Sequence, residues 1–142
     1  MAYARARSGS GDSVTALDLA SKWETLLVGR EPQVDDFLEF ALGLVHTSGA
    51  HVSVRHLRDS QLEFAVSSEK IERAEPDALG ILRMICARLA VLSAGGGLPS
   101  FYGVTFDGAL SLGAVTVSTR LVFHNAMNGQ IFFALSPAAG PR

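Results

Sequence analysis

The sequence predicts an α+β domain, a two-layer α/β sandwich in which an antiparallel-rich mixed sheet of about five strands carries three helices on one face. Three observations lead to this prediction. Apolar residues recur at helical spacing before residue 49 and again in 76–94, they alternate with a period of two elsewhere, and the 142 residues suit a single domain. We expect a flexible tail at 1–12, one domain at 13–136 and a second flexible tail at 137–142.

Two helices are predicted first. Asp12 or Ser13 can cap the first helix, because their side-chain oxygens accept hydrogen bonds from free backbone N–H groups, and Gly29 suits its end. Pro32 fits the first turn of the second helix, which Gly49 would end. In the first helix Val14, Leu17, Ala20, Glu24 and Leu27 follow one another at helical spacing, and Trp23 and Leu26 widen this stripe. The stripe of the second consists of Val34, Phe37, Leu38, Ala41, Leu44 and Val45.

A hairpin follows, because the apolar period changes to two. Strands are expected over 51–57 and 62–66, joined by a turn at 58–61. The polar stretch 67–75 is interpreted as a connection. A third helix runs from Pro76 to about Ala94, with one stripe of Leu79, Leu82, Ile85, Leu89 and Leu92, and with further apolar surface from Ile81, Met84, Cys86 and Val91. A helix that is apolar on most sides is expected to be central.

The remainder is predicted to be strand. Gly95-Gly96-Gly97 and Pro99 end the third helix, and the dipeptide Asp107-Gly108 is typical of a turn after a strand at 101–106. The alternation over 110–123 changes phase near Gly113, which indicates a bulge or a break into two strands. A last turn and a last strand are expected at 125–129 and 130–135.

Composition limits the classes of function. Hydrophobic residues make up 48% of the chain and the mean hydropathy is +0.26, so we expect a partner or a second copy to cover some apolar surface. A net charge of −2 and a pI near 6.0 give no electrostatic reason to expect nucleic acid as a partner. We expect no membrane partner, because no signal peptide or membrane-spanning run is apparent. The single cysteine, Cys86, permits no intramolecular disulfide and favours a reduced, cytoplasmic setting.

No catalytic, cofactor-binding or metal-binding residue is assigned. The histidines His51 and His56 lie an odd number of residues apart on one predicted strand, so they point to opposite faces, and His46 and His124 stand elsewhere. Cys86 lies in an apolar helix, where burial would raise its pKa and leave it unreactive. The carboxylates Asp35, Asp36 and Glu39 occupy the polar side of a helix start, which is typical of a solvated face.

One arrangement resembles a known family. The helix at 34–46, the hairpin, the segment Glu72-Arg73-Ala74-Glu75-Pro76-Asp77-Ala78-Leu79, the glycine cluster and the closing 128–137 strand are similar to the histidine-kinase-like ATPase (GHKL) fold and its histidine-phosphotransferase-like relatives. The resemblance implies a nucleotide-binding type of fold in degenerate form. Ile85 and Leu89 stand where the family carries asparagines for magnesium and phosphate, and Asp107-Gly108 is a poor counterpart of its adenine loop. The same element order also suits roadblock-like and profilin-like regulatory modules.

The expected function is that of a non-catalytic protein-interaction or regulatory domain in signal transduction, homodimeric and cytoplasmic. A nucleotide- or small-ligand-binding protein of the histidine-kinase or anti-sigma type is the main alternative, and a hydrolase built from distant residues is a third. Two features would discriminate between them. A large apolar patch on a helix or edge strand would locate an interface, whereas a polar-rimmed cavity beside the helix from Pro76 to Ala94 would favour a ligand.

Overall fold

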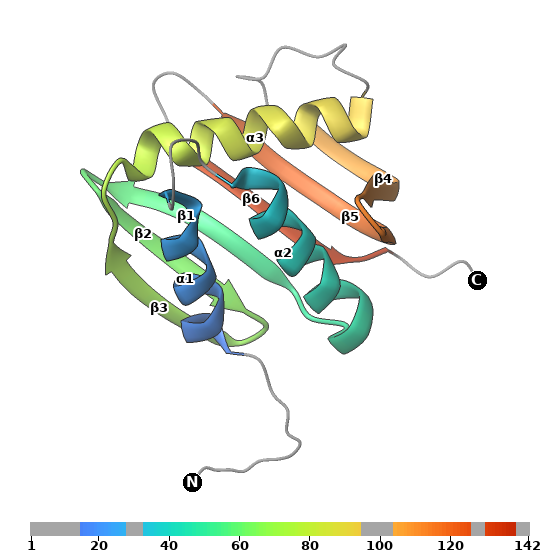
Figure 1. Ribbon diagram of the computed structural model, residues 1–142, viewed down its shortest axis with the longest axis horizontal. Helices are drawn as coiled ribbons and strands as arrows, with labels where there is room; N and C mark the ends of the chain where they lie inside the picture. Colours follow the sequence, from blue (N-terminus) through green and yellow to red (C-terminus); the bar gives the residue numbers. More distant parts are fainter. Residues whose placement is uncertain (1–14, 28–32, 95–103, 126–129, 139–142) are drawn as a thin grey trace, which may run out of the picture.

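The described part of the chain forms three α-helices and six strands in two layers (Figure 1). The structure is a computed structural model that describes residues 15–27, 33–94, 104–125 and 130–138. The elements, in chain order, are α1 (Ala16–Glu24) with a 3-10 turn (Thr25–Leu27), α2 (Val34–Ser48), β1 (Val52–Arg58), β2 (Gln61–Val66), β3 (Glu69–Ala74), α3 (Ala78–Ala94), β4 (Val104–Leu112), β5 (Val115–Asn125) and β6 (Ile131–Pro137). The predicted α+β class is confirmed.

The strands form one sheet in the order β3-β2-β1-β6-β5-β4. Each neighbouring pair is antiparallel, so the sheet consists of two meanders joined where β6 pairs with β1. All three helices lie on one face of it: α1 packs over β2 and β3, α2 over β5 and β6, and α3 over β4 and β6 (Figure 1). The other face carries no helix in the described part of the chain. The sheet has one strand more than the five expected.

The additional strand is β3, which lies within the stretch interpreted from the sequence as a polar connection. Its exposed residues Glu69, Lys70, Glu72 and Ala74 give it no apolar alternation. It forms because β2 offers a complete row of hydrogen-bonding partners, from Gln61 opposite Ala74 to Val66 opposite Glu69. This edge strand buries one apolar side chain in part, Ile71, and charged residues at an edge discourage pairing with other chains.

The two N-terminal helices differ from the prediction in detail. Thr15 caps α1 in a capping box with Asp18, whereas the expected roles of Asp12, Ser13, Gly29 and Pro32 lie outside the described residues. The predicted stripe of α1 is wrong at Leu17, which is 56% exposed. The face that packs on the sheet is formed instead by Ala16, Leu19, Ala20, Trp23 and Leu26. In α2 the prediction is confirmed, and Gly49 ends the helix in the left-handed conformation (φ +62°).

The predicted turn at Asp107-Gly108 is wrong, because both residues lie inside β4. Asp107 faces Arg120 of β5 and forms an ion pair with it, with Nη2 2.9 Å from Oδ2. Gly108 serves a close contact: the ring of Phe106 lies where a Cβ would stand, with 2.7 Å between that position and Cζ. The predicted break near Gly113 is confirmed, since this residue (φ +61°) separates β4 from β5.

The core lies between the sheet and the helices and is centred on aromatic rings. Trp23 of α1 meets Phe37 of α2 and Phe64 of β2 edge to face, at centroid distances of 5.3 and 5.5 Å. Phe37 meets Phe133 of β6 in the same way at 6.4 Å. Such pairs add about 0.5–1.5 kcal/mol each beyond the area they bury. This cluster holds α1 and α2 onto the middle of the sheet.

Candidate functional site

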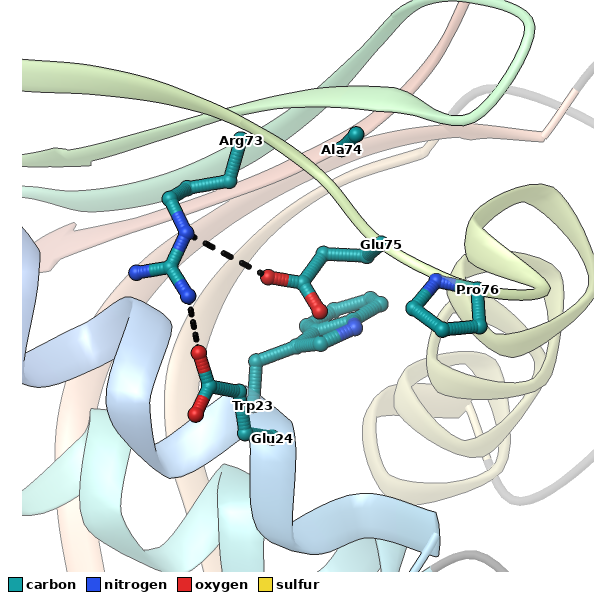
Figure 2. A pocket seen from close by; sticks show the side chains of 6 residues that line it. All are labelled: Trp23, Glu24, Arg73, Ala74, Glu75 and Pro76. Atoms are coloured by element: carbon teal, nitrogen blue, oxygen red, sulfur yellow. Dashed lines mark hydrogen bonds and ion pairs between the residues drawn. The ribbon is translucent and has the colours of Figure 1, made fainter.

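A cavity of about 330 Å³ opens where the end of α1 meets the end of β3 and the approach to α3 (Figure 2). The described residues that line it are Trp23, Glu24, Arg73, Ala74, Glu75 and Pro76. Its volume lies at the lower end of the range for small-molecule sites. This is a polar-rimmed cavity beside the N-terminal end of α3, the feature that would favour a ligand.

Backbone geometry places Glu75 at the cavity. Side chains alternate along a strand, so Arg73 and Glu75 share the side that faces the helices, and Ala74 points away. Pro76 restricts the preceding residue to an extended conformation, which continues the direction of β3 by one residue. The backbone N–H of Glu75 donates to the carbonyl oxygen of Ser60 at 2.9 Å. Glu75 is therefore held inward and is only 5% exposed.

Three charged side chains meet here, two of them acidic. Arg73 forms an ion pair with Glu24 through Nη2, and its Nε lies 3.7 Å from Oε2 of Glu75 (Figure 2). The second distance is too long for a hydrogen bond. Oε2 of Glu75 is buried and has no hydrogen-bond partner in the described part of the chain. With one guanidinium for two carboxylates, the cluster carries an excess negative charge when both are ionised.

Burial is the main perturbation of the Glu75 carboxyl group. It raises the pKa of Glu75, the charge of Arg73 opposes this, and the charge of Glu24 raises the pKa further. A carboxylate with this combination of desolvation and a specific charge partner, lining a cavity, is a recognised sign of a functional site. Ion pairs with a purely structural role also shift pKa values in this way. The cavity and the missing hydrogen bond of Oε2 are therefore stronger indications of a functional site than the raised pKa of Glu75.

Trp23 gives the cavity an aromatic wall. Its indole ring lies beside the carboxylate of Glu75 in Figure 2, and the ring is held in place by Phe37 and Phe64. The residue is 2% exposed, so most of the ring belongs to the core and only an edge meets the cavity. The cavity therefore combines a rigid apolar wall with two carboxylates.

The outer face of α3 is a second candidate surface. It contradicts the prediction of a helix buried on most sides, because Leu79, Met84 and Val91 are exposed, the last two by 45% and 46%. The helix lies along one margin of the sheet layer, so only the face with Leu82, Ile85 and Leu89 reaches the core. The single other large apolar side chain exposed in the described residues is Leu17. Three of these four side chains thus lie on one helix.

The face of the sheet without helices is a third surface. Its middle is apolar and half-buried, with Phe132, Ala134 and Val122 on β6 and β5. His124 stacks on Phe132 at a centroid distance of 6.1 Å, and its Nδ1 lies 2.8 Å from the carbonyl oxygen of Gln130. Arg55 pairs with Glu63 at 3.2 Å on the neighbouring strands. Ion pairs and short side chains thus surround a small apolar centre.

The residues considered for chemistry in the sequence do not line the cavity beside Glu75. Cys86 is fully buried, and burial raises its pKa to about 12, as expected for a thiol in an apolar helix. Ile85 and Leu89, which occupy the positions of the family's polar ligands, are core residues. Asp35 accepts from Nε of Arg88 at 2.8 Å and so joins α2 to α3, whereas Glu39 packs against Gly113. No group of three or more His, Cys, Asp or Glu side chains in the described ranges could hold a metal ion.

Sequence reasoning missed Glu75 and Arg73 as site residues, because they lie in the segment interpreted as a connection. A usable signal was the single apolar residue Ile71 flanked at two-residue spacing by Glu69 and Arg73. That spacing is typical of an edge strand with one polar face toward a helix. It would have placed Arg73 and Glu75 on the inner side.

The described residues define a two-layer α+β domain that has its helices on one face of the sheet and a charged cavity at one end. No protein-family model and no curated protein matches the sequence. Within the described residues, no helix combines the length and the apolar character needed to cross a bilayer.

Proposed function

We propose that this chain is a non-catalytic protein-interaction domain that pairs with a second copy of itself through the outer face of α3. The observation that carries the proposal is the exposure of Met84 and Val91 on that face. They are two helical turns apart, so they project to the same side. Single exposed apolar residues are common, but two that project to the same side of one helix form an apolar surface.

The spacing of the face supports helix-to-helix packing. Gly80, Met84, Ala87 and Val91 follow one another at intervals of four, three and four residues, which is the spacing of a coiled-coil seam. Two small residues alternate with two large ones along this seam.

The alternation makes the seam complementary to itself. If two copies of α3 packed antiparallel around a twofold axis between residues 85 and 86, Met84 would face Ala87 of the second copy. Val91 would then face Gly80 of that copy. Large side chains would thus fill the spaces above small ones on both halves, which a twofold interface requires.

The charges beside the seam support the same arrangement. Arg88 flanks the seam and forms an ion pair with Asp35, with its Nε and Nη2 2.8 and 3.2 Å from the two carboxylate oxygens. The pair neutralises a charge that would otherwise stand at the edge of the contact. The apolar, buried nature of Ile85 and Leu89 is the reason for proposing an interaction domain rather than the nucleotide-binding alternative.

The test compares two exposed apolar positions. Met84→Glu places a charge in the seam, whereas Leu17→Glu places one at an exposed leucine on α1. Molar mass is measured by light scattering and sedimentation over a wide range of micromolar concentrations. We expect wild type and Leu17→Glu to dimerise, and Met84→Glu to dissociate with a dimer constant about tenfold weaker or more.

Two results would overturn the proposal. One is a wild-type chain that stays monomeric across the whole range. The other is a loss of dimer that is equal in Met84→Glu and Leu17→Glu, because the contact would then not lie on α3. Circular dichroism of each variant confirms that the helix content is unchanged.

A further inference from the structure

The cavity beside Glu75 has features that a self-association surface does not explain. It lies before the start of α3 and at the end of α1, and its lining includes none of the seam residues Gly80, Met84, Ala87 and Val91. A buried carboxylate normally has its hydrogen bonds satisfied, since a buried oxygen without a hydrogen-bond partner lowers stability. Oε2 of Glu75 lacks such a bond within the described residues, and the side chain lines a cavity large enough for a small ligand.

The charges of the cluster indicate the sign of a ligand. Arg73 is the only cation lining the described cavity, and its guanidinium already interacts with both Glu24 and Glu75. An anion would meet two carboxylates and a guanidinium whose charge is already offset. A cation would meet an excess of negative charge at low effective dielectric, where attraction is stronger than in water.

The geometry also limits the kind of cation. A divalent metal needs several converging oxygen or nitrogen ligands, and the described residues contain no such group. A guanidinium prefers a carboxylate that offers both oxygens in a fork, but one side of the Glu75 carboxylate already faces Arg73 (Figure 2). A primary ammonium is compact and can donate to a single oxygen.

The walls of the cavity suit the alkyl chain that would carry this group. Trp23 and Pro76 provide apolar surface on the sides next to Glu75 (Figure 2). Apolar surface next to a carboxylate shelters the methylene groups that adjoin an ammonium group. We propose that this cavity, lined by Glu75, Glu24 and Trp23, is a binding site for a primary alkylammonium group.

The same ammonium could belong to a free amine or to a lysine side chain, and these two sources are separated by the choice of probe. The first probe is n-butylammonium chloride, and the second is an acetylated, amidated Ala-Lys-Ala peptide. Equal affinity for the two probes assigns the site to the ammonium group alone and so to free amines. Tighter binding of the peptide assigns it to a lysine presented by a polypeptide.

Intrinsic fluorescence is a direct reporter, because Trp23 is the only tryptophan in the chain. The full-length protein is titrated with n-butylammonium chloride at constant ionic strength, and with n-butanol and sodium chloride as matched controls. We expect a saturable change in emission with the ammonium salt only. No saturable change, or an equal change with n-butanol, would overturn the proposal.

Variants locate the site. Glu75→Gln keeps the shape of the side chain and removes its charge, so we expect binding of n-butylammonium to weaken about tenfold or more. Glu63→Gln is the matched control, since Glu63 forms an ion pair with Arg55 on the sheet face without helices. The Glu63→Gln protein should bind n-butylammonium with the affinity of wild type. Glu24→Gln provides a second test if Glu75→Gln unfolds, and should also weaken binding. Unchanged affinity in every folded cavity variant would refute the assignment.

Discussion

Gly113 joins β4 to β5. Replacing it with alanine should lower the free energy of unfolding in two ways, through backbone strain and through a collision with a side chain. Its φ of +61° lies in the left-handed region, and a Cβ placed on it would stand 2.8 Å from Oε2 of Glu39. Gly49, at the end of α2, has nearly the same φ of +62°, but no heavy atom lies within 4 Å of its Cβ position. The pair of substitutions Gly113→Ala and Gly49→Ala therefore separates backbone strain from a side-chain collision.

The expected magnitudes follow from this geometry. A left-handed alanine costs roughly 1 kcal/mol or slightly more at either site. At Gly113 the Glu39 carboxylate must also move, and because it is the far end of a flexible side chain this adds only about 0.5 kcal/mol. We expect Gly49→Ala to lower the free energy of unfolding by about 1 kcal/mol, and Gly113→Ala to lower it by about 1.5 kcal/mol.

Urea denaturation at a fixed protein concentration measures both values, and a double-mutant cycle with Glu39→Ala tests their origin. In the Glu39→Ala background the cost of Gly113→Ala should fall to that of Gly49→Ala, because the collision is gone. A cost at Gly113 that is equal in both backgrounds would show that Glu39 does not crowd this turn. A cost near zero at both glycines would refute the left-handed conformation.

Three further predictions concern other described residues. Because burial raises the folded-state pKa of Glu75, the protonated carboxyl group stabilises the fold below the unfolded pKa near 4.5, and this stabilisation is lost as the pH rises through the folded pKa. Without ligand, Glu75→Gln should therefore be more stable than wild type at neutral pH and lose this advantage below pH 4.5. Urea denaturation across pH measures the difference in stability, and a difference independent of pH would contradict the assignment. Phe133→Ala should lower the free energy of unfolding by about 3–5 kcal/mol, because Phe133 is fully buried. Phe132→Ala, on the sheet face without helices, should lower it clearly less. Equal losses of stability in the two variants would argue against an open face. Cys86 should resist a thiol reagent in the native protein at pH 8 and react on unfolding, because burial raises its pKa to about 12; rapid native labelling would show that α3 is not packed as described.

The sequence predicted those elements whose signal is local. Residues 34–46 and 62–66 were assigned correctly, because the apolar period follows directly from which face is buried. Gly49 and Gly113 marked true boundaries, since both adopt a conformation that suits glycine. The same reasoning failed at Gly108, where the missing side chain makes room for the ring of Phe106 instead of allowing a turn. A glycine can serve a turn or a close contact, and the sequence does not distinguish these uses.

The candidate site could not be predicted from the sequence for a related reason. Glu75 carries no motif, and its importance comes from Arg73, Glu24 and Trp23, of which the last two come from a helix about fifty residues earlier in the chain. The exposure of Met84 and Val91 was also hidden, because an apolar helix can be buried all round or can present a free apolar side. Only the packing of α3 at the margin of the helix layer decides between them.

The sequence by itself determined the α+β class, the order of most helices and strands and the position of the break at Gly113, because spacing and backbone preference act between near neighbours. The tertiary structure decided that 69–74 is an edge strand, which side of α3 is free and that Glu75 is buried beside a single arginine. Those properties arise from contacts between distant segments. The neighbouring residues in the sequence do not determine that 69–74 pairs with β2, and they do not determine that the carboxylate of Glu75 is shielded from water.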